Sequence, residues 1–207
     1  MPLYRDEAER LLRDHHGRLL EGRDIHLSFL HKLWDDDDWS FVIKVQAFIE
    51  ASVTDLLVTH VGDEKLKSLI ELLPLADEKI GKLAIAKALG LMSPEQRRFV
   101  RTMATLRNKL AHRVDHIEFT FSDHVLSLNA SALKDWKQSL IWFPTGDSHD
   151  YWYLGAESQP KVAIWLGTFL LVAQLLIAAK EADAKRKINA AALQTGEELY
   201  RHNCETR

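Results

Sequence analysis

The sequence contains few residues that interrupt helices. Only nine Gly and five Pro occur in 207 residues. Gly costs backbone entropy in a helix and Pro removes a hydrogen-bond donor, so their scarcity favours long helices. Hydrophobic residues at 46% and charged residues at 28% are typical of a globular protein and not of a disordered one. We therefore predict a mainly all-α protein, with residues 1–207 forming a single domain.

Cysteine is almost absent as well. Cys204 is the only one, which excludes an intramolecular disulfide and any zinc site built from cysteines. A single thiol is compatible with the reducing cytosol. The first residues are charged and lack the apolar core of a signal peptide. We therefore expect a cytoplasmic protein.

A surplus of positive charge is also lacking, because the formal net charge is −3. Any binding to nucleic acid must therefore use a local basic patch. One segment provides such a patch, since residues 97–113 hold six basic residues and no carboxylate: Arg97, Arg98, Arg101, Arg107, Lys109 and Arg113. On a helix these side chains point in several directions, so only some of them can face one phosphate backbone.

Long hydrophobic runs are rare, and one is present. Residues 162–179 carry no charge and are bracketed by Lys161 and Lys180. The run meets the lower limit of length for a membrane span. However, a central helix that is buried on all sides has the same composition, and Gly167, Thr168 and Gln174 interrupt the run. We favour a buried core or dimer helix, with a single membrane span as the alternative.

The apolar periodicity divides the chain into four regions. The clearest amphipathic pattern runs from Trp39 to Val61, where Asp38 or Ser40 would cap the helix and Gly62 would end it. We predict N-terminal helices, a helical core, a mixed region and C-terminal helices in residues 1–38, 39–115, 116–160 and 161–207.

The mixed region departs from the helical pattern. Strict alternation in residues 117–121, with a partner segment at 125–128, predicts a small β-hairpin insertion. A helix follows to about Trp142, and residues 143–160 then look irregular. Their three aromatics (Tyr151, Trp152 and Tyr153) either stack on nucleic-acid bases or, as we favour, cover an edge of the core. Two further helices are expected, over 161–180 and about 181–200.

The chemically most capable side chains lie at the end of one helix. Ser93 and Gln96 are spaced as a capping box, with Pro94 at the first helical position. Near the other end, the stretch Arg107-Asn108-Lys109-Leu110-Ala111-His112 combines a guanidinium, an amide and an imidazole. These groups can bind phosphate and transfer protons.

Helical geometry separates the groups of this stretch. At about 100° per residue, the core stripe contains Phe99, Met103, Leu106 and Leu110, and a second stripe of mostly small residues contains Val100, Ala104, Arg107 and Ala111. Asn108 and His112 lie on the side away from the core. Arg107 and His112 are about 140° apart on a regular helix. They can converge if the helix ends near Ala111, or if two copies pack across a two-fold axis, so we predict a homodimer.

The spacing of Arg107, Asn108 and His112 resembles the Arg, polar residue, three residues, His motif of the HEPN domain superfamily. The core helix from Trp39 and the segment Ile80–Gly90 are similar to that superfamily too. The stretches Phe48-Ile49-Glu50-Ala51-Ser52 and Leu89-Gly90-Leu91 resemble its mannitol operon repressor branch. The resemblance covers residues 39–115 and implies a HEPN-like helical bundle, to which the hairpin insertion and the C-terminal helices are additional.

What the resemblance implies is a dimer that cleaves RNA without a metal or any other cofactor. Arg107 would hold the scissile phosphate, His112 would act as general acid or base at the ribose 2′-OH, and Asn108 would orient His112 or contact phosphate. Nearby cations expected to bind the RNA are Arg101, Lys109 and Arg113. Such an enzyme could be a toxin or a phage-defence component, with an antitoxin or a regulatory protein as partner.

Three alternatives remain open on the sequence. The chain could be a non-catalytic dimeric regulator or adaptor, as in the mannitol operon repressor branch. Arg107 could pair with a carboxylate while His112 caps the helix C-terminus. A zinc site is the third and less favoured alternative. His112, Asp115 and His116 are plausible zinc ligands, but the helix would end before His116.

Overall fold

The computed structural model describes residues 32–111 and 118–205, and every regular element in that part of the chain is helical. The all-α prediction is therefore confirmed. The α-helices are α3 (Asp38–Val61), α4 (Lys67–Leu72), α5 (Lys82–Ala88), α6 (Pro94–Ala111), α7 (Phe121–Leu126), α8 (Ala130–Leu140), α9 (His149–Ser158) and α10 (Pro160–Glu205), with 3₁₀ turns at Glu64–Leu66 and Gly146–Ser148. The predicted N-terminal helices lie outside the described residues as far as residue 31.

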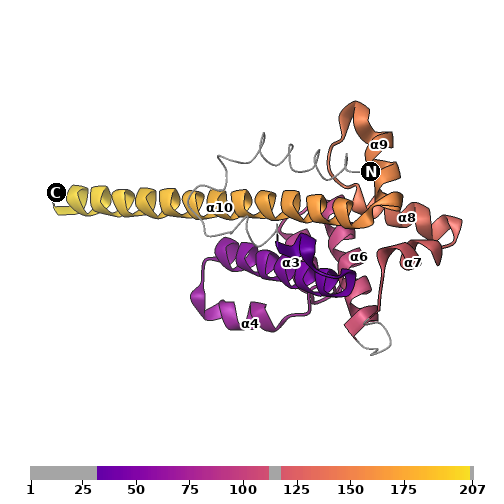
Figure 1. Cartoon of the computed structure of the whole chain (residues 1–207). Helices are drawn as coiled ribbons and strands as arrows, with labels where there is room; N and C mark the ends of the chain where they lie inside the picture. The colour runs from indigo at the N-terminus through magenta and orange to yellow at the C-terminus, as the bar shows by residue number, and fades with distance from the viewer. Residues whose placement is uncertain (1–31, 112–117, 206–207) are drawn as a thin grey trace.

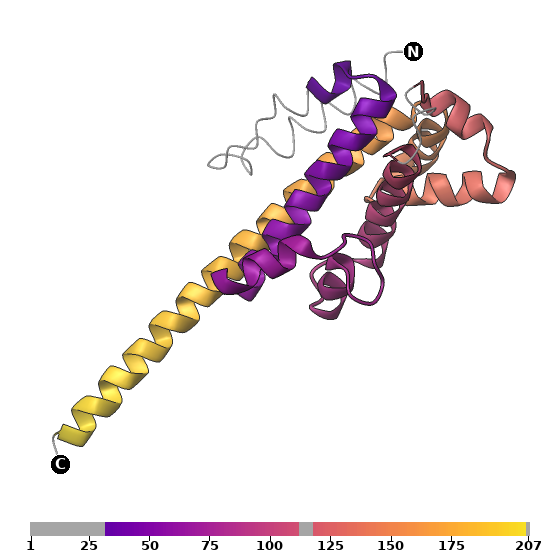
Figure 2. The ribbon, with the colours of Figure 1, turned by 90° about the horizontal axis from the view of Figure 1, so that it is seen from below.

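Helices α3 and α10 run side by side in the same direction and form the spine of the molecule (Figures 1 and 2). Their starts are joined by Lys161, whose Nζ lies 3.5 Å from Asp38 Oδ1 and donates to the carbonyl of Asp36. Further along, Arg186 of α10 donates to the carbonyl of Thr59 near the end of α3 at 3.0 Å. These contacts at both ends fix the register of the pair.

The uncharged run lies in the first half of α10 and is mostly buried. Of its most apolar 18-residue window, 72% is buried inside the protein. By length and composition the helix could also cross a membrane, but its apolar side chains already belong to a single core cluster that extends from Leu33 to Ala179. The run is therefore a core helix, as the favoured interpretation predicts.

The second half of α10 differs from the first. Nearly all its residues from Lys180 to Glu198 are exposed, and this half extends away from the rest of the protein (Figure 1). The prediction of two separate helices over 161–180 and 181–200 is wrong, because α10 is continuous. No Pro or Gly stands near residue 180, and the Ala-, Lys- and Glu-rich sequence that follows has high helix propensity.

The caps of the two central helices are local in the sequence. Asp37 caps α3, where its Oδ1 accepts from the Ser40 backbone N–H at 2.9 Å, so the prediction of Asp38 or Ser40 was wrong by a residue or more. Gly62 ends α3 with φ +70°, as predicted. The capping box of α6 is confirmed, since Ser93 and Gln96 exchange hydrogen bonds of 2.7 and 3.2 Å.

The predicted β-hairpin is wrong over the residues that are described. The segment from Phe121 to Leu126 is helix α7, capped by Thr120, whose hydroxyl accepts from the Asp123 backbone N–H at 3.1 Å. Phe121 and Val125 are its buried residues, and their spacing of four is helical. Phe121 packs edge-on against Phe41 of α3, with ring centroids 5.9 Å apart. Tertiary burial and the cap thus override the alternating pattern.

The segment predicted as irregular, 143–160, instead contains the short helix α9. Its Trp152 is buried, which confirms the core-edge interpretation for this aromatic residue. Trp136 of α8 donates its indole N–H to the carbonyl of Ala156 at 3.2 Å and ties the two helices together. Tyr153 lies at the surface of this unit, where Lys137 Nζ is 4.4 Å from the centre of its ring.

Candidate functional site on two sides of helix α6

The motif side of α6 carries Arg107 and Asn108. Asn108 is exposed and Arg107 is half-buried. The guanidinium donates to Asn108 Oδ1 at 3.0 Å. Among the described residues no carboxylate forms an ion pair with Arg107, so the structural alternative of a paired arginine finds no support in that part of the chain. The amide holds the planar guanidinium at the surface, where its other N–H groups can bind an anion.

His112 and Arg113 lie outside the described residues, as do the alternative metal ligands His116 and Asp115. The convergence of His112 with Arg107 is therefore still a prediction. Among the described residues, no group of three or more His, Cys, Asp or Glu side chains could hold a metal ion.

The small-residue stripe of α6 is largely occupied by the protein's own core. Val100 and Ala104 are only 0% and 4% exposed in the single chain, where α6 packs on α3. They cannot also form a contact with a second copy unless the fold opens. Arg107 and the exposed Ala111 are the accessible members of the stripe. A dimer contact on this side must therefore use the last turn of α6.

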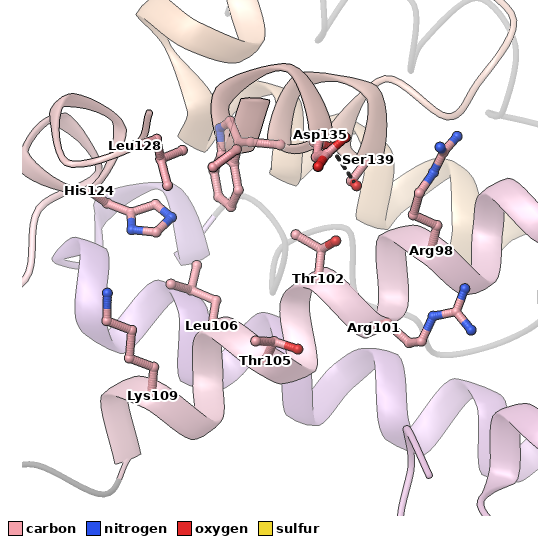
Figure 3. Close-up of a pocket in the computed structure, with 12 residues that line it drawn as sticks. Arg98, Arg101, Thr102, Thr105, Leu106, Lys109, His124, Leu128, Asp135 and Ser139 are labelled. Atoms are coloured by element: carbon pink, nitrogen blue, oxygen red, sulfur yellow. Dashed lines mark hydrogen bonds between the residues drawn. The ribbon is translucent and has the colours of Figure 1, made fainter. Parts of the chain in front are cut away.

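The opposite side of α6 forms one wall of a groove whose other walls are α7 and α8 (Figure 3). The groove has a volume of about 400 Å³. The apolar side chains of Leu106, Leu128 and Trp136 lie along it, and three cations of α6 line it: Arg98, Arg101 and Lys109. This cavity was not predicted from the sequence.

His124 of α7 stands at one end of the groove beside Lys109 (Figure 3). Its ring lies edge-on to Trp136 with centroids 4.9 Å apart, and it also contacts Phe119 at 5.9 Å. Burial lowers the pKa of His124 below its usual value, and the nearby Lys109 cation lowers this pKa further. The imidazole is therefore mainly neutral at pH 7.

The structure divides the basic segment between the two sides of α6. Arg101 and Lys109, two of the predicted RNA ligands, face the groove together with Arg98. Arg107 points the other way, because it is about 160° from Lys109 around a regular helix. The described basic residues therefore do not form one continuous surface.

Sequence analysis missed His124 as a neighbour of Lys109. Fifteen residues separate them, and the interpretation of residues 117–128 as a hairpin placed His124 in a turn. The Thr120-x-x-Asp123 spacing was an available signal, because such a pair caps a helix. A helix starting at residue 121 places His124 one turn after Phe121, on the same side of the helix.

A second cavity, of about 780 Å³, is polar and lies between α3, α4 and α10. At its edge Lys82 is only 2% exposed and donates to Glu50 Oε1 at 2.9 Å. The other charged residues lining it are of both signs: Asp55, Lys67, Glu71, Asp183 and Arg186. Arg186 and Asp183 pair with each other at 2.7 Å, so this cavity has no marked preference for an anion or a cation.

Comparison with protein-family models, with curated proteins and with solved structures finds no match. The resemblance to the HEPN superfamily therefore rests on the residues named above, and chiefly on Arg107, Asn108 and His112.

Proposed function

We propose that this protein is a HEPN-like, metal-independent endoribonuclease that acts as a dimer. The observation that carries the proposal is the surface arrangement of Arg107 and Asn108. The guanidinium is anchored by the neighbouring amide and has no carboxylate partner among the described residues. An arginine held in this way is suited to a phosphate, because its planar fork is already oriented and is not neutralised.

The reaction needs one proton acceptor and one proton donor. The ribose 2′-oxygen attacks phosphorus as its proton passes to a base, and the 5′-oxygen leaves as it receives a proton from an acid. His112 would act as the proton acceptor or donor, since an imidazole titrates near neutral pH. Arg107 stabilises the negative charge that develops on the phosphoryl oxygens. Two copies of the chain would supply two imidazoles, one for each proton transfer.

The last turn of α6 is the surface that such a dimer would use. Val100 and Ala104 are committed to the core, so an isologous contact would form around Ala111 and bring the two Arg107 side chains near one cleft. The biological role that fits a nuclease of this kind is a toxin or a phage-defence component that a partner protein neutralises.

The test is cleavage of a fluorescently labelled RNA by the purified protein in the presence of EDTA. We expect cleavage by the wild type, and a loss of about 10²–10³-fold in Arg107→Ala, the range seen when one donor to a developing oxyanion is removed. His112→Ala should also be inactive. The matched control is Lys87→Ala, which removes an exposed cation from α5 and should cleave normally. Wild-type rates in Arg107→Ala would refute the proposal.

A second candidate function is a non-catalytic regulator or adaptor, and the exposed half of α10 favours it. A helix that extends well beyond the core offers a long surface for another protein (Figure 2). Exposed Ile188 and Leu193 lie on this half. This function predicts that the wild type does not cleave RNA, and that Ile188→Glu combined with Leu193→Glu changes its oligomeric state in light scattering, whereas Arg107→Ala does not.

A further inference from the structure

The groove between α6 and α8 has the dimensions and composition of a small-molecule site. Its volume of about 400 Å³ lies within the range of ligand pockets, which is roughly 300–1,000 Å³. Leu106 and Trp136 give it apolar walls, and both side chains are themselves buried. A flat apolar group bound here would be removed from water. It would contact side chains that the core already holds in place.

The charges on the groove favour an anion. Three cations line it, against one carboxylate, Asp135. Among the described residues Arg98 and Lys109 form no ion pair, and Arg101 forms only a surface pair, in which its Nη1 lies 3.4 Å from Glu78 Oε1. A surface pair of that length contributes little, so Arg101 can bind a ligand at small cost.

The cations are arranged along the groove rather than in one cluster. Arg98 and Arg101 stand on successive turns at one end, and Lys109 stands at the other beside His124 (Figure 3). The distance along the helix axis from residue 101 to residue 109 is about 12 Å. The apolar side chains Leu106 and Leu128 lie toward the Lys109 end, and Thr102, Asp135 and Ser139 lie nearer the arginines (Figure 3). A ligand of this length therefore needs an anionic group at one end and an apolar body next to it.

We propose that this groove binds a small organic acid with an aromatic body, whose anionic group is held by Arg98 and Arg101. Guanidinium groups bind carboxylate, sulfonate and phosphate oxygens through paired N–H donors. The aromatic body lies along Leu106 and reaches the edges of Trp136 and His124, where ring contacts are favourable. The arginine of the proposed nuclease site, Arg107, does not line this groove, and the assignment of the groove stands without the nuclease.

The experiment is a fluorescence titration of the full chain at pH 7 with 8-anilinonaphthalene-1-sulfonate, an aromatic acid that fluoresces in apolar surroundings. We expect saturable binding of one dye per chain. Arg98→Ala combined with Arg101→Ala should raise the Kd at least tenfold. Ala132→Trp, which places a large side chain in the groove, should abolish binding. The matched controls are Lys134→Ala, on the opposite face of α8, and Arg107→Ala, and both should bind like the wild type.

Charge dependence is tested by competition. 2-Naphthoate should displace the dye, and the neutral analogue 2-naphthalenemethanol should do so at least ten times more weakly. Equal competition by the two compounds would overturn the proposal, as would unchanged dye affinity in the double arginine variant. A 2′-O-methyl RNA oligonucleotide should leave the dye bound. Its displacement of the dye at one oligonucleotide per site would assign the groove to nucleic acid and overturn the small-acid assignment.

Because Arg98 is exposed and the half-buried Arg101 forms only a surface ion pair, their replacement should not unfold the protein, and far-ultraviolet circular dichroism of the double variant checks this. The double arginine variant therefore keeps the proposal falsifiable even if Ala132→Trp fails to fold. Absence of saturable binding by both the dye and 2-naphthoate to the folded wild type would equally refute it.

Discussion

The two sides of helix α6 show two ways of presenting positive charge. Arg107 and Asn108 are neighbours in the sequence that project from a single turn, and Arg107 lies on the side away from Lys109. Arg98, Arg101 and Lys109 instead line a groove that exists only because α8 packs against α6 and α7 brings His124 to its end. The first arrangement is a local motif, whereas the second is a product of tertiary packing. They should therefore respond differently to substitution.

The largest expected difference is in stability. Leu106→Ala removes a side chain that is 4% exposed and forms a wall of the groove, so the free energy of unfolding should fall by about 2–3 kcal/mol, in the lower part of the usual range because the site borders a cavity. Asn108→Ala, two residues away on the exposed side, should change it by less than about 0.5 kcal/mol. Urea denaturation followed by circular dichroism measures both. Equal losses would contradict the contrast between the two sides.

An Arg-to-Lys substitution, which preserves the charge, should affect RNA cleavage at Arg107 but not at Arg98. Arg107→Lys keeps the positive charge but loses the planar fork that grips a phosphate, so RNA cleavage should fall about tenfold. Arg98→Lys should leave cleavage unchanged, because Arg98 faces the groove. The two variants are compared in the same cleavage assay. If Arg107→Lys cleaved as fast as the wild type, the guanidinium would act only as a point charge and its hydrogen bond with Asn108 would have no functional meaning.

The smallest expected effect concerns the pH dependence of stability and arises on the groove side alone. The pKa of His124 lies below its usual value of 6.5 in the folded protein, so below pH 6.5 the unfolded chain binds more protons there. Stability should therefore decrease as the pH falls from about 6.5 toward the lowered pKa, and then level off.

His124→Gln should reduce this acid-dependent loss, and Lys109→Met should reduce it partly, because Lys109 is the second cause of the lowered pKa after burial. Thermal unfolding at a series of pH values between 7.5 and about 5 would measure these slopes. Identical pH curves for wild type and His124→Gln would show that burial does not lower the pKa of this group.

Features that depend on near neighbours in the sequence could be predicted. The capping box at Ser93 and Gln96, the end of α3 at Gly62 and the core stripe of α6 all appear as expected, because each depends on residues within about one or two helical turns. The uncharged run 162–179 was interpreted as a buried core or dimer helix, with a membrane span as the alternative, and the burial of 72% of its most apolar window shows that it belongs to the core.

The errors have a common cause. The alternating residues near Phe121 suggested a strand, but the aromatic ring of Phe41 and the cap at Thr120 make the segment a helix. The expected break near residue 180 is missing because α10 passes from buried to exposed surroundings without any helix-breaking residue. Both errors came from a local sequence pattern: an alternating one near Phe121, and a change from apolar to charged residues near residue 180 that was taken for a change of secondary structure.

The sequence alone determined the all-helical class, the capping box of α6, the end of α3 at Gly62 and the cluster of Arg107 with Asn108, because these depend on propensity and spacing within a few turns. Only the tertiary structure decided which basic residues share a surface. Lys109 and His124 line one groove because α8 packs on α6 and α7 places His124 at its end, and Val100 and Ala104 are unavailable to a partner because they are buried in the core of the single chain. Contacts between distant segments follow from how helices bury their apolar faces together, and no local pattern specifies that arrangement.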